Sequence, residues 1–147
     1  IAADAQQKFI RINKNCTAFT DTHLVATLLA NAKQNDVFFG ISYSGMTSEV
    51  VKMIELAKKK GIRTVSLTKY GQTRVSDSAE ISLYAAMVKE AAFRSGATAS
   101  RIAQLQVLDI LFMSIAALQY DKVVRRIDET REAISYIKNG NKKRNRK

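Results

Sequence analysis

The chain has 147 residues, 46% of them hydrophobic, which is the size of one domain with a buried core. Cys16 and His23 are single residues of their types, so an intramolecular disulfide and a cluster of metal ligands are both excluded, and we assign both residues structural roles. The sequence shows no leader pattern and no apolar run near the length of a membrane span, which favours a cytoplasmic protein without a membrane partner.

The first forty residues predict two helices and two strands. Apolar residues at helical spacing indicate an amphipathic helix over residues 1–14. Cys16 to Phe19 can form a short strand, and Asp21 is placed to cap a second helix that ends near Asn35. The apolar run 37–41 is typical of a buried strand.

The remainder continues the alternation and then becomes helical. The predicted elements are a helix from Thr47 to Lys60, strands over 62–67 and 81–85, and long helices through 102–115 and 123–137. Residues 68–80 are polar and lack a helical stripe. Strands that alternate with helices predict an α/β fold with a parallel sheet covered on both faces.

The two ends of the chain differ from its body. The net charge of +11 is concentrated in residues 138–147, which hold no acidic and no apolar side chain, and we expect this segment to be a disordered, solubilising tail. A nucleic-acid-binding arm is the alternative, but no aromatic residue is present there for base stacking. Because the chain starts at Ile1 inside a helix, we expect its first strand to be missing.

The motif Ser42-Tyr43-Ser44-Gly45-Met46-Thr47-Ser48-Glu49 lies between a predicted strand and a predicted helix. Such a junction directs free backbone N–H groups and the positive end of the helix dipole at one small volume. Three hydroxyls and a glycine in this loop therefore predict a phosphate cradle.

The predicted cradle is uncharged. It lacks the lysine of a P-loop, which argues against ATP chemistry and favours a small phosphorylated metabolite. The alternative is that Ser42, Ser44 and Thr47 are ordinary turn and capping residues, which hydroxyl side chains also favour.

The same motif resembles the S-x-S-G-x-T-x-E signature of sugar isomerase (SIS) domains. The opening helix, the run Glu90-Ala91-Ala92-Phe93-Arg94-Ser95-Gly96 and the run Ser100-Arg101-Ile102-Ala103-Gln104-Leu105 are similar to the RpiR family of bacterial transcriptional regulators. These resemblances extend over residues 1–137.

The resemblance implies a flavodoxin-like three-layer α/β/α fold with a five-stranded parallel sheet. It also implies a bound phosphosugar, association into a homodimer or tetramer, and an N-terminal helix-turn-helix domain that contacts operator DNA. That domain, the first strand and the loop after the first strand are not in this sequence. The resemblance implies no cofactor and no metal.

Carried onto this sequence, the resemblance makes the hydroxyls of Ser42, Ser44 and Thr47 phosphate ligands, assisted by amides from Tyr43 through Gly45 to Thr47. Glu90 lies where SIS domains contact the sugar, although an ion pair with Arg94 explains it equally well. We assign Glu49 a structural role in the first turn of its helix.

Two functions are compatible with this site. The first is a sensor domain that binds a phosphosugar and controls sugar-metabolism genes without transforming the ligand. The second is an aldose-ketose isomerase, for which Glu90 and His23 are the candidate acid–base residues. We prefer the sensor, because His23 lies on the polar side of a predicted helix.

Overall fold

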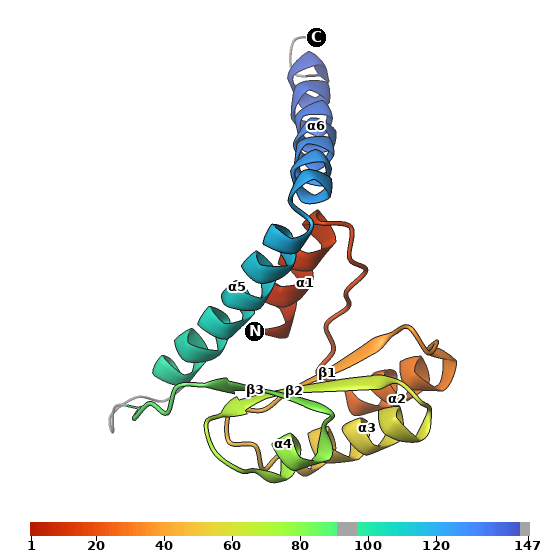
Figure 1. Ribbon diagram of the computed structural model, residues 1–147. Coiled ribbons are helices and arrows are strands. Elements are labelled where there is room, and N and C mark those ends of the chain that lie inside the picture. The colour runs from red at the N-terminus through yellow and green to blue at the C-terminus, as the bar shows by residue number, and fades with distance from the viewer. Residues whose placement is uncertain (91–96, 145–147) are drawn as a thin grey trace.

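The computed structural model describes residues 1–90 and 97–144, with side chains to residue 138. Three layers are visible, with helices on both faces of a parallel sheet (Figure 1). The elements are α1 (Ala2–Arg11), α2 (Thr22–Asn31), β1 (Val37–Ile41), α3 (Ser48–Lys59), β2 (Arg63–Lys69), α4 (Arg74–Ser78), β3 (Ile81–Ala85), α5 (Ala99–Leu118) and α6 (Tyr120–Arg144).

The sheet of the described residues has three parallel strands in the order β1-β2-β3. In register, Ile41 lies opposite Leu67, and Leu67 lies opposite Leu83, so the three strands end at one common edge. The parallel three-layer architecture is confirmed, with three strands in place of the five that the family resemblance implies. Loops that carry ligands in such folds lie beyond this carboxyl edge.

The two faces of the sheet have separate cores. Helices α2, α3 and α4 cover one face (Figure 1). On this face Ile54 and Val75 are fully buried. Helices α1 and α5 cover the other, where Leu67 and Leu108 belong to one cluster. Burial on both sides agrees with the continuous apolar run of β1, whereas the central strand β2 also buries the hydroxyl residues Thr64, Ser66 and Thr68.

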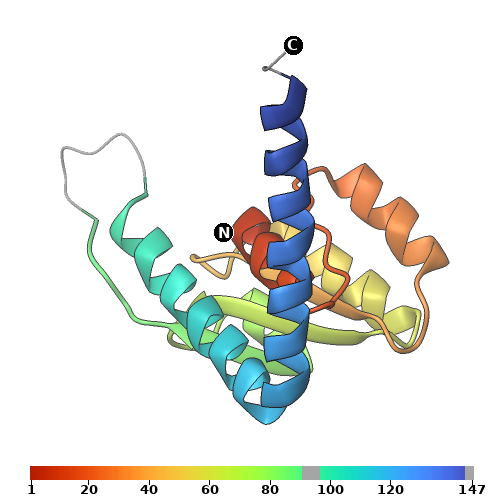
Figure 2. The same cartoon turned by 90° about the horizontal axis from the view of Figure 1, so that it is seen from above.

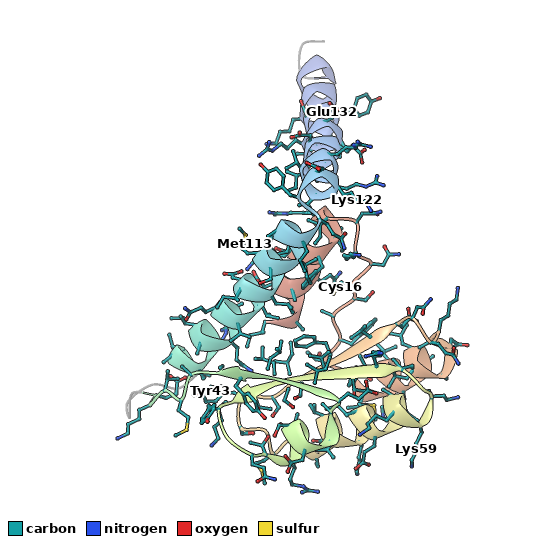
Figure 3. The ribbon with its side chains drawn as sticks, viewed as in Figure 1. Cys16, Tyr43, Lys59, Met113, Lys122 and Glu132 are labelled. Atoms are coloured by element: carbon teal, nitrogen blue, oxygen red, sulfur yellow. The ribbon has the colours of Figure 1, made fainter. Side chains whose placement is uncertain are left out.

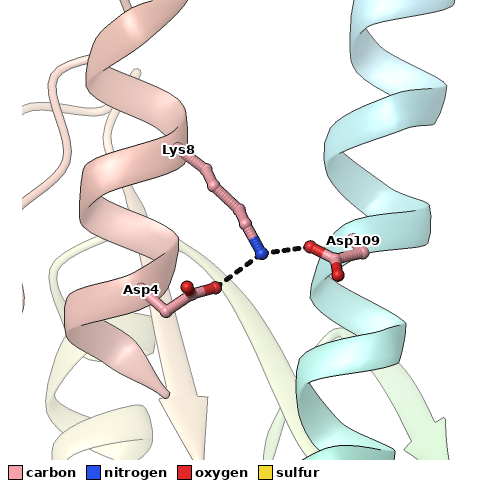
Figure 4. Close-up of polar contacts among 3 residues, drawn as sticks. All are labelled: Asp4, Lys8 and Asp109. Carbon is pink, nitrogen blue, oxygen red and sulfur yellow. Dashed lines mark hydrogen bonds and ion pairs between the residues drawn. The ribbon is translucent and has the colours of Figure 1, made fainter.

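An ion-pair network joins α1 to α5 (Figure 4). The ammonium group of Lys8 lies 2.7 Å from a carboxylate oxygen of Asp4, one turn earlier on α1. It also contacts the carboxylate of Asp109 on α5. The contact with Asp109, followed by that with Asp4, raises the pKa of Lys8.

Three local expectations from the sequence are wrong. Residues 16–19 form no strand, because the amide of Ala18 donates to the side chain of Gln6 at 2.7 Å and no strand pairs with this segment. The polar segment 68–80 contains α4, which is too short to show a helical stripe. The second helix ends at Asn31 rather than near Asn35, although Asp21 caps it as expected.

Helix α5 is longer and more apolar than the sequence analysis anticipated. With 20 residues and a mean hydropathy of 1.5, it has the length and composition of a membrane span, and 17% of that window is buried. It nevertheless carries Arg101 and Asp109 and packs against β3 and α1. We therefore describe it as an outer-layer helix with an apolar outer side.

Helix α6 projects away from the sheet (Figure 1), and a view from above shows it diverging from α5 (Figure 2). It continues to Arg144, so most of the segment expected to be a disordered tail is helical; residues 145–147 lie outside the described part. Lysine and arginine are good helix formers, so a preceding helix can propagate into such a basic segment.

Candidate functional site

The candidate site is the loop between β1 and α3, at the carboxyl edge of the sheet. Two backbone hydrogen bonds hold it beside β2: the amide of Ser42 donates to the carbonyl of Leu67 at 3.0 Å, and the amide of Lys69 donates to the carbonyl of Tyr43 at 2.9 Å. The loop is therefore an extension of the sheet, with its backbone fixed before any ligand arrives.

The three predicted hydroxyls converge. The Oγ atom of Ser42 lies 2.7 Å from Oγ1 of Thr47 and 3.5 Å from Oγ of Ser44. Ser42 is buried, whereas Ser44 and Thr47 are exposed. The cluster thus opens to solvent at two of its members, Ser44 and Thr47, and is anchored by the buried Ser42.

Capping does not explain Thr47. It occupies the N-cap position of α3, yet its side chain accepts no hydrogen bond from that helix and points to Ser42 instead. The first amides of a helix have no partner within the helix, so the start of α3 retains donors and a positive dipole end beside the hydroxyls. Ser44 has in addition a local role, because its Oγ accepts from the amide of Met46 at 3.2 Å.

Gly45 is required by packing. Its φ is +68°, in the left-handed region, and a Cβ added there would lie 2.3 Å from Oγ1 of Thr73. The carbonyl of Gly45 also accepts from the amide of Val75 at 3.0 Å. The left-handed backbone is the unusual conformation that a glycine permits in this loop, and the missing Cβ also makes room for Thr73 at the start of α4.

The support from α4 was missed by sequence reasoning. Thr73 and Ser76 form a buried capping box, in which Thr73 Oγ1 accepts from the amide of Ser76 at 3.1 Å and Ser76 Oγ accepts from the amide of Thr73 at 2.9 Å. The spacing of a hydroxyl residue and a second polar residue three positions later was the available signal.

Glu49 makes local contacts at the start of α3. It lies in the first turn of α3, where its carboxylate accepts from Ser48 Oγ at 3.1 Å. Its pKa is lowered, first by its own backbone amide and then by this hydroxyl. The contacts recorded for Glu49 are thus local ones in the first turn of the helix.

Glu90 lies at the start of α5. Its carboxylate accepts from the amides of Thr98, Ala99 and Ser100 at 2.8–3.2 Å and from Ser100 Oγ at 2.6 Å. These bonds, that from Ser100 Oγ first, lower its pKa to about 2. The alternative partner Arg94 lies outside the described residues.

Neither Cys16 nor His23 joins the site. Burial raises the pKa of the Cys16 thiol, which makes it a poor nucleophile, and His23 is an exposed residue near the start of α2. Within residues 1–90 and 97–138, no group of three or more His, Cys, Asp or Glu side chains is placed to hold a metal ion. The candidate site therefore consists of hydroxyls and amides, which bind anions without forming covalent bonds.

Anion-binding loops of this kind, at the carboxyl edge of a parallel sheet, define a class of α/β ligand-binding domains. Residues 1–114 match the SIS domain model, and the chain belongs to the SIS domain family.

Similar proteins are bacterial regulators. The chain is 53% identical over 138 residues to an uncharacterized HTH-type transcriptional regulator of Bacillus subtilis, YbbH, covering 94% of this chain and 49% of that protein. It is 29% identical over 140 residues to the HTH-type transcriptional regulator RpiR of Escherichia coli, and the match covers 95% of this chain and 47% of RpiR. The chain thus spans about half the length of the curated relatives it matches.

Solved structures agree with the fold. NanR of Vibrio vulnificus, complexed with ManNAc-6P, matches with a TM-score of 0.81 and 32% identity, over 92% of this chain and 50% of that one. The sugar isomerase domain of an RpiR transcription factor from Sphaerobacter thermophilus matches with a TM-score of 0.76 and 20% identity, over 89% and 71%, which supports the fold alone.

Proposed function

We propose that this chain is the effector-binding domain of a transcriptional regulator and that it binds the phosphate of a phosphorylated sugar at the β1–α3 loop. The observation that carries the proposal is the orientation of Thr47. Its hydroxyl does not cap α3 but forms a hydrogen bond with the hydroxyl of Ser42. The free donors at the start of α3 and the hydroxyls of Ser42 and Ser44 would bind one terminal phosphate. Hydrogen bonds to such a charged group each contribute about 1.5–3 kcal/mol.

One relative supports the ligand class, because NanR was solved with ManNAc-6P. Other relatives, named as HTH-type regulators, support the regulatory role. A ligand held by backbone amides and hydroxyls needs no cofactor and no metal. We therefore propose a cytoplasmic sensor of sugar phosphates, whose operator is contacted by a helix-turn-helix domain in the remainder of the protein.

An isomerase is the second candidate, and the environment of Glu90 disfavours it. Isomerisation needs a base whose pKa lies near the working pH. With a pKa of about 2 and its oxygens bound to the first turn of α5, Glu90 is a weak base. We propose that Glu90 serves the sugar as a hydrogen-bond acceptor rather than as a catalyst.

Self-association is part of the proposal. Large apolar side chains are exposed along α5 and α6, at Ile102, Ile110, Met113, Leu118, Ile134, Tyr136 and Ile137. Apolar surface of this extent marks an interface. We propose that a second copy of the chain covers it in a homodimer or tetramer, and that the ligand favours one arrangement of the copies, by about 1–3 kcal/mol.

The experiment is a titration calorimetry series on this chain with sugar phosphates, starting with N-acetylmannosamine 6-phosphate and glucosamine 6-phosphate. Ser44→Ala and Thr47→Val should each weaken binding about tenfold or more, whereas Thr27→Val, on the exposed side of α2, should leave affinity unchanged. Equal affinities in all four proteins would contradict the proposed site. Turnover of the same compounds, lost in Glu90→Gln, would favour the isomerase.

A further inference from the structure

Tyr43 connects the β1–α3 loop to the segment that leaves β3. Its hydroxyl accepts from the amide of Val88 at 2.8 Å and donates to the carbonyl of Ala86 at 3.1 Å. Figure 3 labels Tyr43 at the end of the sheet below the start of α5. One hydroxyl thus satisfies a backbone donor and a backbone acceptor that belong to a segment more than forty residues away in sequence.

The ring of Tyr43 reinforces this connection. It packs against the cluster that contains Leu67 of β2 and Ala103 and Leu108 of α5, and Val88 packs against the same cluster. The aromatic side chain therefore contacts the core that α5 shares with the sheet, while its backbone remains part of the loop with Ser42 and Ser44.

The segment reached by Tyr43 continues directly to Glu90. Two residues after Val88, the Glu90 carboxylate binds the amides of Thr98 and Ser100 in the first turn of α5. These bonds replace the side-chain cap that Thr98 does not supply at its own N-cap position. The start of α5 is thus held by a residue whose place depends on the segment 86–88.

We infer that Tyr43 is a positioning residue that links the conformation of the β1–α3 loop to the first turn of α5, through the segment 86–90. The ligand-dependent part of this inference rests on the proposed function. When phosphate binds this preordered loop and restrains it further, Tyr43 keeps Val88 and hence Glu90 in place, and α5 is stabilised at its start. Because α5 contacts α1 and α6, phosphate binding would also stabilise the helices that carry the exposed apolar side chains of α5 and α6.

The first experiment needs no ligand and compares hydrogen–deuterium exchange of peptides covering 84–90 and 97–104. Tyr43→Phe leaves the Val88 amide without its acceptor, so exchange in both peptides should accelerate about fivefold, the effect of losing one hydrogen bond of about 1 kcal/mol. Tyr70→Phe is the matched control, since Tyr70 is 69% exposed and lies beside Tyr84. Unchanged exchange at 97–104 in Tyr43→Phe would overturn the link.

The second experiment adds inorganic phosphate to the same proteins. In the wild-type chain, phosphate should slow exchange both in a loop peptide covering 42–50 and in 97–104; in Tyr43→Phe it should slow exchange in the loop alone. Equal protection of 97–104 in both proteins would overturn the coupling. If the loop of the wild-type chain gains no protection, the proposed function is at fault, and the ligand-free comparison still decides whether the link exists.

Discussion

The Oγ1 atom of Thr47 lies 2.7 Å from the Oγ atom of Ser42, and this contact joins the end of a strand to the start of a helix. The amide of Ser42 donates to the carbonyl of Leu67 in the neighbouring strand β2, so the sheet fixes the position of the hydroxyl pair. A ligand phosphate held here would contact a surface already ordered by the sheet, which reduces the entropy lost on binding.

Gly45→Ala should destabilise the chain by about 2–4 kcal/mol, because the new methyl group meets Thr73 and the residue must keep a positive φ. Gly61→Ala is the matched control: its φ is +73°, with no atom within 4 Å of the added Cβ, so it should cost only about 1–2 kcal/mol. Urea denaturation of the two variants measures both values. Equal losses would show that the contact with Thr73 adds nothing.

Glu90 should make the chain sensitive to acid. The pKa of Glu90 falls from the ordinary 4.5 to about 2 in the folded chain. Its contribution to the free energy of unfolding is therefore fully present above pH 4.5 and disappears as the pH falls through about 2. The difference in unfolding free energy between the wild-type chain and Glu90→Gln should therefore shrink between pH 4.5 and 2.

Glu49→Gln is the comparison for this acid effect, because the pKa of Glu49 is also lowered but without contacts to α5. Urea denaturation across this pH range measures each difference. A constant difference between the wild-type chain and Glu90→Gln would contradict the assigned contacts.

Lys8→Met should remove the connection between α1 and α5 at little thermodynamic cost. The Lys8 side chain is 27% exposed and that of Asp109 is 55% exposed, and such pairs contribute about 0–1 kcal/mol. Contact with Asp109 raises the Lys8 pKa. The contribution of the ion pair to the free energy of unfolding is therefore present below pH 10.5 and is lost as the pH rises through the raised pKa.

Thermal unfolding at low and high salt checks the Lys8 prediction, with Lys14→Met as the control at an exposed position outside the helices. The loss in Lys8→Met should shrink at high salt. A salt-independent loss would indicate that packing of the lysine stem, rather than charge, is responsible.

Met113→Glu should shift the chain toward the monomer. Met113 is 63% exposed on α5, and a buried carboxylate at an interface between copies is costly unless it is paired. Gln34→Glu, at an exposed position in the turn between α2 and β1 and away from α5 and α6, should leave the oligomeric state unchanged. Sedimentation velocity distinguishes the species. A wild-type chain that sediments as a monomer at all concentrations would contradict the proposed second copy.

Local pattern in the sequence determined most of the elements and the place of the candidate site. The strands at 37–41 and 81–85, the cap at Asp21 and the convergence of three hydroxyls around the loop follow from periodicity, capping chemistry and the rule that strand ends share an edge. These features depend on neighbours within a few residues, so one chain is sufficient to predict them.

Tertiary structure alone decided the roles of Gly45, Tyr43 and Glu90. Gly45 and Tyr43 meet partners far away in sequence, at Thr73 and Val88, and Glu90 meets the first turn of α5 eight to ten residues later. No spacing in the sequence encodes such contacts, because they arise only when separate elements pack on one sheet. For the same reason, the segment 16–19 has strand composition but no strand, since a strand exists only where another pairs with it.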